Sequence, residues 1–261
     1  MTSRHGDRPD AFVQSLERGL SVINSFSRDA PSQTLSEVAE RTDLTRATSR
    51  RILLTLSELG YVRQRGRSFA LTPKVLDLGY SFLSSFHVVE LAQPSLERLV
   101  DQVHESSSMS VLDGSEIVYV ARVPTKRIMT IALALGSRLP AYPTSMGRVL
   151  LAGLDDDELD GYIATTKLEK LTPHTIDDAE TLRVAVLEVR EQGFALVDQE
   201  LEEGVRSVAA PIRNGRGKVI AAVNVSGHAS RVDIERMLEE FKPRLIEAAA
   251  EITDRARSLQ I

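Results

Sequence analysis

Apolar positions recur with helical spacing at the start of the chain. Phe12, Leu16 and Leu20 are four residues apart, and the pattern continues as far as residue 26. Positions separated by four residues lie on one face of an α-helix. The pattern therefore predicts a helix over residues 12–26, which ends before Pro31.

Two shorter helices are predicted next, separated by a tight turn. Thr34 and Glu37 have the spacing of a capping box, so the second helix begins after Thr34 and reaches about residue 41. A third helix is expected from Thr45 or its neighbour to Leu59, with Gly60 as its C-cap. Two helices joined by a turn, the second rich in arginine, are typical of a helix-turn-helix.

A short β-hairpin is predicted immediately after the third helix. Residues 61–64 and 69–71 flank a turn at Gly66. The tip of this hairpin would carry Arg63, Arg65 and Arg67. A basic hairpin in this position is typical of a wing, which suits contact with the DNA backbone or the minor groove.

The third helix and the wing supply the candidate DNA-binding residues. The N-terminal half of such a helix enters the major groove, where arginine can anchor a phosphate or bond twice to guanine. We expect Arg46 and Arg50 to share an exposed face, with Ser49 beside them. The candidates are Thr45, Arg46, Thr48, Ser49, Arg50, Arg51, Arg63, Arg65 and Arg67. The alternative, a solvated helical module with surface arginines, is less favoured because the wing follows in the right place.

The rest of the chain predicts a larger domain that mixes helices and strands. We expect helices over residues 88–103, 145–154, 156–164, 179–192 and 232–257, and strands over residues 108–112, 117–121, 129–135, 194–198, 205–212 and 218–226. This mixture indicates an α+β domain around one sheet. A linker helix over residues 73–86 would join it to the head, and could either pack on the head or pair with its copy in a dimer.

These patterns divide the chain into four parts. Residues 1–10 are expected to form a disordered leader, and residues 11–72 a winged helix-turn-helix domain. The linker helix, residues 73–86, follows. Residues 87–261 are expected to form the second domain.

Charge separates the head from the body of the chain. The formal net charge of the 261 residues is −5. Residues 1–70 contain eleven arginines, no lysine and eight acidic residues, which gives this part +3 and leaves −8 for the rest. A basic head on an acidic body is expected when only the head meets the phosphates of nucleic acid.

Composition and motifs exclude several classes of function. The chain has no cysteine, which excludes disulfides and thiolate metal sites and fits a reducing cytoplasm. Neither a signal peptide nor a membrane span is evident. The five histidines lack metal-ligand spacing, and no nucleophile elbow or nucleotide-binding glycine loop occurs. The acidic residues 155–158 are interpreted as a helix cap rather than a metal site. We therefore expect no cofactor, no metal and no enzymatic activity.

The body offers a candidate binding pocket on its predicted strands. Strict alternation places two sets of side chains on opposite faces of the last strand: Val219, Ala221, Val223 and Val225 on one, Ile220, Ala222, Asn224 and Ser226 on the other. On the neighbouring strand Val205, Ser207 and Ala209 share a face. Buried polar groups are costly unless they are hydrogen-bonded. Ser207, Asn224 and Ser226 therefore either satisfy one another or bind a ligand.

A second candidate element is the start of the helix at residue 145. Thr144 or Ser145 would cap this helix, and the free N–H groups of a helix N-terminus attract a carboxylate. Pro140 and Pro143 would stiffen the loop that leads to it. An ordinary capped helix is the alternative. Arg206 could pair with a carboxylate, but its strand position points it away from Ser207.

Several of these segments together resemble one family. Residues 44–56 (LTRATSRRILLTL) with Gly60-Tyr61-Val62 resemble the recognition helix of IclR-type transcriptional regulators. Residues 136–141 (GSRLPA), 144–152 (TSMGRVLLA) and 204–212 (GVRSVAAPI) resemble their effector-domain signatures. Within that family, residues 119–122 (YVAR) and 127–129 (RIM) are most similar to regulators of the β-ketoadipate pathway.

The resemblance implies a fold, a function and a set of partners. It implies a GAF-like effector-binding domain, dimers or dimers of dimers on a palindromic operator in double-stranded DNA, and control of aromatic-acid catabolism. The effector would be a small organic acid of the protocatechuate, 4-hydroxybenzoate or β-ketoadipate type, and RNA polymerase is a candidate further partner.

The effector-binding residues implied by the motifs are Met129, Ile131, Leu139, Ser145, Met146, Val205, Ser207, Asn224 and Ser226. Met146 and Asn224 argue against the tiny keto acids that other members bind. An enzyme acting on a small aromatic acid and an effector-free DNA-binding oligomer remain the alternatives.

Overall fold

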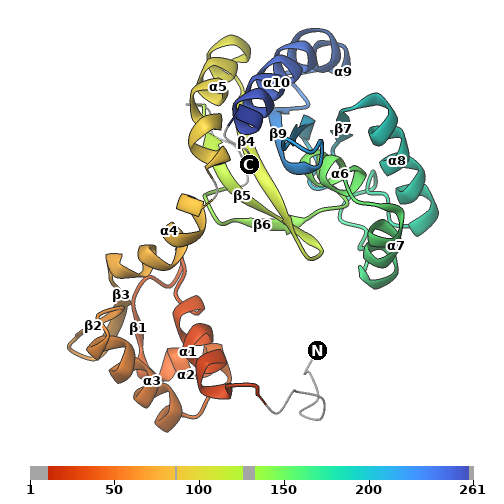
Figure 1. The fold of residues 1–261 in the computed structure, drawn as a ribbon. Helices are drawn as coiled ribbons and strands as arrows, with labels where there is room; N and C mark the ends of the chain where they lie inside the picture. The colour runs from red at the N-terminus through yellow and green to blue at the C-terminus, as the bar shows by residue number, and fades with distance from the viewer. Residues whose placement is uncertain (1–10, 86, 126–132, 259–261) are drawn as a thin grey trace. The chain divides into compact units, whose positions relative to one another are not determined.

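A computed structural model describes residues 11–85, 87–125 and 133–258 of the chain. The chain divides into two compact units, Met1–Ser85 and Phe86–Ile261 (Figure 1). Each unit has its own buried core. The two units are described separately below.

The first unit consists of a head, which has three helices and a small sheet, and the linker segment that follows it (Figure 1). The helices of the head are α1 (Gln14–Asn24), α2 (Leu35–Thr42) and α3 (Arg46–Glu58). Its strands are β1 (Gln33–Thr34), β2 (Val62–Arg65) and β3 (Ser68–Leu71), in the antiparallel order β1-β3-β2. This arrangement confirms the winged helix-turn-helix that the sequence predicts.

Local signals in the sequence set the boundaries of the head's helices. The Thr34 side chain and the Glu37 side chain form the expected capping box at the start of α2. Thr45 caps α3 by accepting a hydrogen bond from the Thr48 backbone N–H. Gly60, with φ of +82°, allows the left-handed turn from α3 into the wing.

The linker segment begins as a 3₁₀ turn, Pro73–Val75, and continues as α4 (Leu76–Ser85). Thr72 caps this turn through the Lys74 backbone N–H, and Pro73 occupies its first position. Proline is tolerated there because the first N–H groups of a helix lack intrahelical partners. The predicted linker helix is therefore helical, with a tighter first turn.

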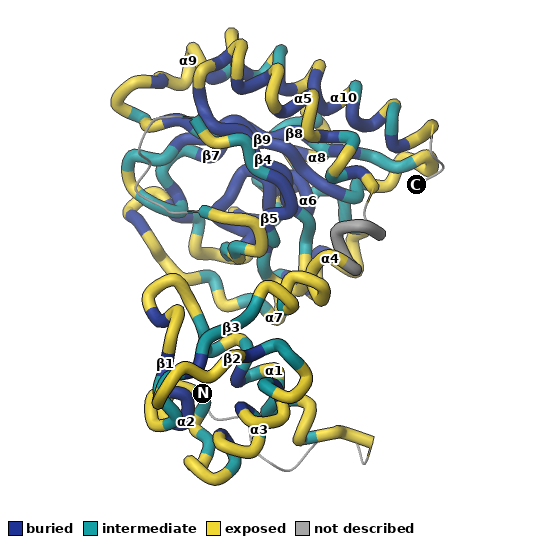
Figure 2. Tube along the Cα trace, turned by 90° about the vertical axis from the view of Figure 1, so that its left-hand side faces the viewer, coloured by how far each residue is buried: buried dark blue, intermediate teal, exposed yellow. Residues whose placement is uncertain are grey.

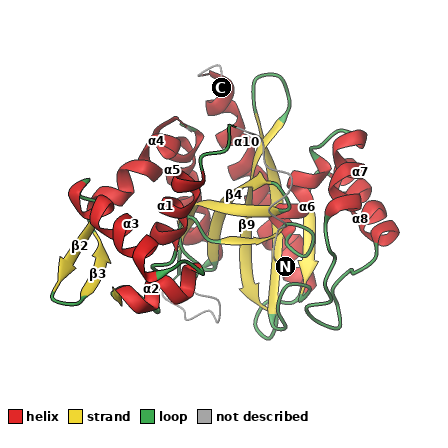
Figure 3. Cartoon of the chain, turned by 90° about the horizontal axis from the view of Figure 1, so that it is seen from below, coloured by secondary structure: helices red, strands yellow, loops and turns green. Residues whose placement is uncertain are grey.

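The second unit is built on a six-stranded antiparallel sheet in the order β6-β5-β4-β9-β8-β7. Its central neighbours β4 and β9 lie side by side in Figure 3. The strands are β4 (Ser106–Asp113), β5 (Glu116–Val123), β6 (Arg138–Pro140), β7 (Ala195–Asp198), β8 (Val205–Arg213) and β9 (Val219–His228). Two hairpins, β4–β5 and β8–β9, meet through the pairing of β4 with β9.

Helices cover both faces of this sheet, and the strands between them are buried (Figure 2). On one face lie α5 (Val88–Val103) and α10 (Lys242–Ser258), which pack with Val208, Val223 and Val225. On the other face lie α6 (Ser145–Ala152), α7 (Asp156–Thr165) and α8 (Ala179–Gln192). The α+β expectation for this part of the chain is confirmed.

Two of the predicted elements differ in the structure. The closing helix is divided into α9 (Ile234–Arg236), a π-helical turn over Met237–Phe241 and α10. Of the predicted strand 129–135, residues 129–132 lie outside the described part, and residues 133–135 are not a strand. The edge strand β6 forms instead at residues 138–140, where it pairs with β5.

The predicted face of Val219 on the last strand is also wrong, because that strand contains a β-bulge. Strict alternation places it with Ala221, but the register between β8 and β9 shifts at residues 212–213. Ile212 pairs with Ala221 and Arg213 pairs with Val219, so Ile220 is an extra residue in the strand. A β-bulge of this kind reverses the faces on either side of it. Val219 therefore packs with α6 and its neighbours, and Ile220 packs against the opposite core.

No helix in the described part of the chain has the length and apolar composition needed to cross a membrane.

Candidate functional site

The exposed face of α3 carries two of the predicted DNA-binding arginines. Arg46 and Arg50 are four residues apart in this 13-residue helix, and both are exposed. Thr45 holds the start of the helix, and its hydroxyl lies 2.9 Å from that of Thr48. The N-terminal half of α3 therefore presents cations on a helix that is capped and packed.

The prediction for Ser49 is wrong, because this side chain is buried in the core of the head. Ser49 has no exposed surface, and its hydroxyl has no hydrogen-bond partner. It is one helical turn from Leu53, which is also fully buried. A side chain on this face cannot reach DNA. A residue as small as serine instead lets α3 pack closely in the head.

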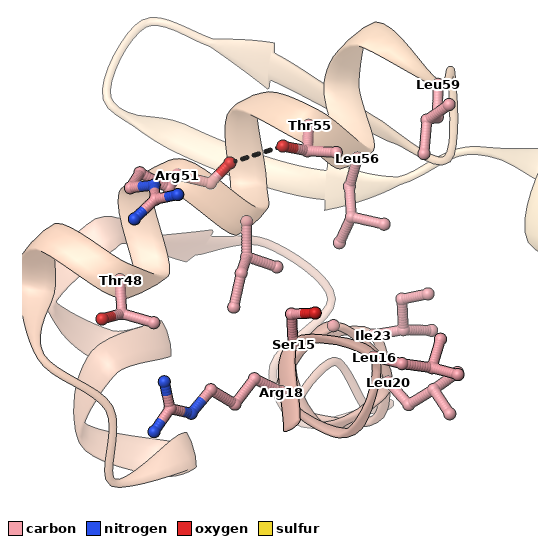
Figure 4. Close-up of a pocket in the computed structure, with 12 residues that line it drawn as sticks. Ser15, Leu16, Arg18, Leu20, Ile23, Thr48, Arg51, Thr55, Leu56 and Leu59 are labelled. Atoms are coloured by element: carbon pink, nitrogen blue, oxygen red, sulfur yellow. Dashed lines mark hydrogen bonds between the residues drawn. The ribbon is translucent and has the colours of Figure 1, made fainter. Parts of the chain in front are cut away.

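Thr48 and Arg51 lie on a different side of α3 from Arg46 and Arg50. Both line a groove between α3 and α1 (Figure 4). Arg51 remains exposed, whereas Thr48 is half-buried. These two candidates therefore border the exposed arginine face rather than lying at its centre.

The wing holds three further arginines, Arg63, Arg65 and Arg67, in exposed positions. Gly66, with φ of +59°, forms its tip, and the Gln64 side chain donates to the Gly66 carbonyl oxygen at 2.9 Å. Within the described residues, no ion pair joins these arginines, or Arg46, Arg50 and Arg51, to a carboxylate. Their charges are therefore available for an external anion.

The second site is a cavity against the sheet of the body, next to α6. Its floor includes Asn224, which is buried and makes two side-chain hydrogen bonds. Its Oδ1 accepts from the Ser108 backbone N–H at 3.1 Å, and its Nδ2 donates to the Ser226 hydroxyl at 2.8 Å. The floor is therefore a fixed set of polar atoms on a buried sheet.

The start of α6 forms the opposite wall of this cavity. Thr144 caps the helix by accepting from the Gly147 backbone N–H at 3.0 Å. The Ser145 and Ser207 hydroxyls lie 2.8 Å apart and so join the helix to β8. The Ser110 hydroxyl lies 3.3 Å from the Met146 sulfur. The helix N-terminus and the polar floor therefore meet at one cavity.

Most of the predicted pocket residues come together at this cavity, namely Ser145, Met146, Val205, Ser207, Asn224 and Ser226. Leu139 is not among the residues that line it; this residue lies on the edge strand β6 and packs against the same apolar cluster as Met146. Met129 and Ile131 lie outside the described residues. Six of the predicted residues thus share one cavity, and the placement of Leu139 is corrected.

The lining also contains Pro143 and Thr144, which the sequence analysis placed at the start of α6 without counting them as effector-binding residues, and four residues that it missed: Tyr119, Leu133, Val197 and Leu201. Val197 pairs with Ser207 across β7 and β8, and this register could have been inferred once Ser207 was chosen. Tyr119 shares the pocket face of β5 with Ile117, two residues away. Leu201 lies in a loop, where no periodic pattern indicates its direction.

Two titratable side chains of β5 lie on or beside the pocket face of the sheet. Burial raises the pKa of Tyr119 to about 12, so this residue stays a neutral phenol at physiological pH. Arg122 lies opposite Ser108, which lies opposite Asn224 on the next strand. Its Nη1 donates to the Ser108 hydroxyl at 3.3 Å. Burial lowers the pKa of Arg122, which shows that the charge is held at a cost in solvation.

A buried ion pair holds the loop that borders the cavity. Arg148 on α6 contacts Glu200 in the loop between β7 and β8, with Nη2 and Oε2 2.5 Å apart. Arg148 also donates to the Tyr142 carbonyl oxygen, and the Thr175 hydroxyl donates to the carbonyl oxygen of Glu200. Burial lowers the pKa of Arg148, and the charge of Glu200 opposes this shift. The pair fixes Leu201, the next residue, at the cavity.

The acidic residues 155–158 form a helix cap, as expected. The Asp155 side chain accepts from the Glu158 backbone N–H at 2.8 Å, and Glu158 accepts in return from the Asp155 backbone N–H. In the ranges 11–85, 87–125 and 133–258 no group of three or more histidine or acidic side chains could hold a metal ion.

A basic winged helix-turn-helix joined to a domain with an internal polar cavity defines a class, the DNA-binding regulators that respond to a small molecule. Comparison with known proteins gives the family. Residues 15–66 match the IclR helix-turn-helix domain, and residues 80–254 match the bacterial transcriptional regulator IclR C-terminal domain. The chain belongs to the IclR family of bacterial transcriptional regulators, whose members are not enzymes.

Named relatives include regulators of aromatic-acid genes. The chain is 44% identical to the Pca regulon regulatory protein of Pseudomonas putida over 94% of this chain and 84% of the relative. It is 36% identical to the p-hydroxybenzoate hydroxylase transcriptional activator of Acinetobacter baylyi, over 94% of this chain and 92% of the relative. The expected family and the expected similarity to regulators of this kind are both confirmed.

Solved structures show the same fold. A transcriptional regulator from Rhodococcus sp. RHA1 is 54% identical, with a TM-score of 0.86, and the match covers 95% of this chain and 100% of that one. An inducer-binding domain of the Acinetobacter transcription factor PobR, solved as a double mutant with 3-hydroxybenzoic acid, is 35% identical with a TM-score of 0.60. That match covers 63% of this chain and 97% of the PobR domain.

Proposed function

We propose that this protein regulates genes for the breakdown of aromatic acids, binding operator DNA through α3 and the wing and a small carboxylic acid in the cavity beside α6. The observation that carries the DNA-binding part is the set of six exposed arginines on α3 and the wing, none of which has an ion-pair partner in the described chain. Such cations exchange counterions for phosphate when DNA binds. The protein would act in the cytoplasm as a homodimer or homotetramer, and RNA polymerase is a further candidate partner.

Substitution of Arg50 tests the assignment of the recognition helix. Arg50→Ala should lower operator affinity by about 1–3 kcal/mol if the side chain contacts a base, at a fixed salt concentration. Arg216→Ala is the matched control, because Arg216 is an exposed arginine at the tip of the β8–β9 hairpin. Equal operator affinity of the two variants, measured by fluorescence anisotropy, would contradict the assignment.

Two features of the cavity favour an acid that carries a hydroxyl group. Arg122 does not itself line the cavity, but it donates to Ser108 beside the floor and so places positive charge near the cavity, which favours a planar anion such as a carboxylate. Asn224, Ser207 and Ser226 offer donors and acceptors for the hydroxyl group. Relatives named for p-hydroxybenzoate hydroxylase and the PobR domain with 3-hydroxybenzoic acid support this chemistry.

The cavity must widen to admit such an acid. Its volume is about 30 Å³, whereas sites for small ligands usually enclose about 300–1,000 Å³. Leu133 and Leu201 border it from segments outside the strands of the sheet. We expect these side chains to move when the ligand enters.

Calorimetry and thermal shift with matched ligands test the effector assignment. Protocatechuate, 4-hydroxybenzoate and β-ketoadipate should be compared with 4-hydroxybenzamide, which lacks the negative charge. The preferred acid should raise the melting temperature, because a ligand that binds the folded state stabilises it by mass action. Arg122→Gln should remove most of the preference for acid over amide, whereas Arg216→Gln should leave it intact.

The outcomes also separate the alternatives. Binding of no acid by a folded protein that still binds its operator would favour an effector-free DNA-binding oligomer. Asn224→Ala should weaken the effector response while it leaves operator binding without effector unchanged. If the effector response of Asn224→Ala equals that of the unaltered protein, the assigned floor is wrong.

A further inference from the structure

Tyr119 brings to the cavity a hydroxyl group that makes no bond within the protein. The residue lies on β5, lines the cavity and is 5% exposed. Its hydroxyl has no hydrogen-bond partner among the residues that the structure describes, and its pKa responds to burial and to the charge of Arg122. A buried donor without a partner costs free energy, which a bound molecule with an acceptor atom can recover.

The other polar side chains of the cavity are already bonded to one another. The hydroxyls of Ser145 and Ser207 lie 2.8 Å apart, and the Asn224 Nδ2 donates to the Ser226 hydroxyl at 2.8 Å. The Asn224 Oδ1 accepts from the Ser108 backbone N–H. A ligand atom can join these bonds, because a hydroxyl both donates and accepts. It gains more at a donor that has no partner in the protein.

A β-bulge places Arg122 on the same side of β5 as Tyr119. The pairing of β4 with β5 shifts between Met109 and Ser110, so Val120 is an extra residue in β5. Residues three apart in a regular strand face opposite sides, and the extra residue removes this difference. The charge of Arg122 acts on the hydroxyl of Tyr119. The strand therefore sets a hydroxyl donor close to a positive charge.

We infer that the Tyr119 hydroxyl donates a hydrogen bond to the carboxylate of an aromatic acid in the cavity, and thereby selects acids over neutral phenols. The inference rests on the proposed effector site and assigns the orientation of the ligand in it. The carboxylate lies toward β5, and the ring hydroxyl lies toward Ser207 and Ser226 on β8 and β9. A hydrogen bond to an ionised acceptor is about twice as strong as one between neutral groups.

The protonation states of the two groups fix which one donates. Burial raises the pKa of Tyr119 to about 12, so the phenol keeps its proton at physiological pH. A carboxylic acid with an ordinary pKa of about 4 has lost its proton there. The tyrosine therefore donates and the carboxylate accepts, and no negative charge on the tyrosine repels the ligand.

Removal of a single oxygen atom tests the inference. Tyr119→Phe keeps the ring, and the free variant should be no less stable than the unaltered protein, because the hydroxyl has no bond to lose. Calorimetry would compare 4-hydroxybenzoate with 4-methylphenol, and protocatechuate with 4-methylcatechol, in which a methyl group replaces the carboxylate. The affinity of the variant for the acids should fall about 10- to 100-fold, the contribution of a hydrogen bond to a charged group. Its affinity for the methyl compounds should change little.

Tyr162→Phe is the matched control. Tyr162 is buried in the same apolar cluster as Tyr119 but does not line the cavity. Its hydroxyl donates to the Ser115 carbonyl oxygen at 3.4 Å, so its removal acts on the stability of the fold. The preference of Tyr162→Phe for an acid over the matching methyl compound should equal that of the unaltered protein.

The outcomes separate this inference from the proposed function. An unaltered protein that binds no acid would overturn both. An unaltered protein that binds β-ketoadipate but neither aromatic acid would leave a carboxylic-acid effector in place and overturn the inference alone. Equal losses of affinity by Tyr119→Phe for an acid and its methyl counterpart would mean that the tyrosine only shapes the cavity. That result would also overturn the inference, as would an unchanged affinity of this variant for the acid.

Discussion

Gly147, in the first turn of α6, lies directly against the backbone of Ala141. A Cβ atom added there would lie 1.9 Å from the Ala141 carbonyl oxygen, which belongs to the backbone and cannot move aside alone. Gly147→Ala should therefore distort the start of α6 and abolish effector binding, with a loss of stability of about 3 kcal/mol or more. Denaturant unfolding and calorimetry with the acid effector measure the two losses.

Gly161 provides the control for this substitution. It lies inside α7, and apart from its two chain neighbours and the adjacent backbone of the same helix, no atom lies within 4 Å of the position of an added Cβ. Gly161→Ala should leave effector binding unchanged and raise stability by about 0.5–1 kcal/mol, because alanine loses less entropy than glycine in a helix. Similar behaviour of the two alanine variants would show that the contact with Ala141 does not constrain α6.

The buried pair of Arg148 and Glu200 predicts a second large effect. Glu200→Leu leaves the Arg148 guanidinium buried without its carboxylate, which typically costs about 3–5 kcal/mol. The double variant Arg148→Met with Glu200→Leu should regain part of that loss, because it removes both buried charges. Unfolding curves of the two single variants and the double variant form the cycle that measures their coupling. Strictly additive losses would mean that the two side chains act independently.

At the scale of the element, the capping box of α2 makes the stability of the head depend on pH. The Thr34 backbone N–H and hydroxyl donate to Glu37 and lower its pKa. A carboxyl group whose pKa is lower in the folded state stabilises that state above the unfolded pKa, and the advantage disappears as the pH falls through the folded pKa. Glu37→Gln should therefore be less stable than the unaltered protein at neutral pH, and the two should converge below about pH 4.

Thermal unfolding of the head's helices across that pH range measures the difference. Glu40→Gln is the matched control, since Glu40 is exposed on the same helix and takes no part in the capping box. A gap between Glu37→Gln and the unaltered protein that persists unchanged into acid would exclude the cap as its origin.

The elements that the sequence predicts well are those with a local signal at each end. α8 begins after the Asp178 cap and ends at Gly193, which has φ of +79°, and its bounds match the prediction. β6 escapes prediction because it has three residues and includes Pro140, so no alternation can be seen. It becomes a strand only because β5 offers an edge.

The cavity shows the same division between local and tertiary information. Ser207, Asn224 and Ser226 can be inferred from the sequence because polar residues interrupt apolar strands. Leu201 depends on the path of a loop. Arg122 depends on which strands lie side by side, because its relation to Asn224 passes through Ser108 on β4. The bulge at Ser110 also places Val120 and Ala121 in one core, against strict alternation. Pairing between distant strands is not contained in any local pattern.

At the scale of the whole molecule, the separation of charge between head and body determines how binding responds to salt. A chain with net charge −5 would be repelled from DNA if its charge were spread evenly. The head instead gathers exposed arginines on α3 and the wing, so a few contacts can release counterions while the acidic body stays in solvent. Added salt should therefore weaken binding of the protein to any duplex. The effector should change the affinity for operator DNA but should leave the dependence of that affinity on salt concentration almost unchanged.

The salt dependence of a wing variant measures how many phosphates the wing neutralises. Replacing Arg63, Arg65 and Arg67 by alanine should reduce the slope of log affinity against log salt by about 0.9 for each phosphate that the wing no longer neutralises. Operator and unrelated duplex should lose affinity to a similar extent, because backbone contacts carry no sequence information. Arg50→Ala should instead reduce the difference in affinity between the operator and the unrelated duplex. If the wing variant keeps the original slope, the wing does not meet phosphate, and α3 alone must account for the attraction.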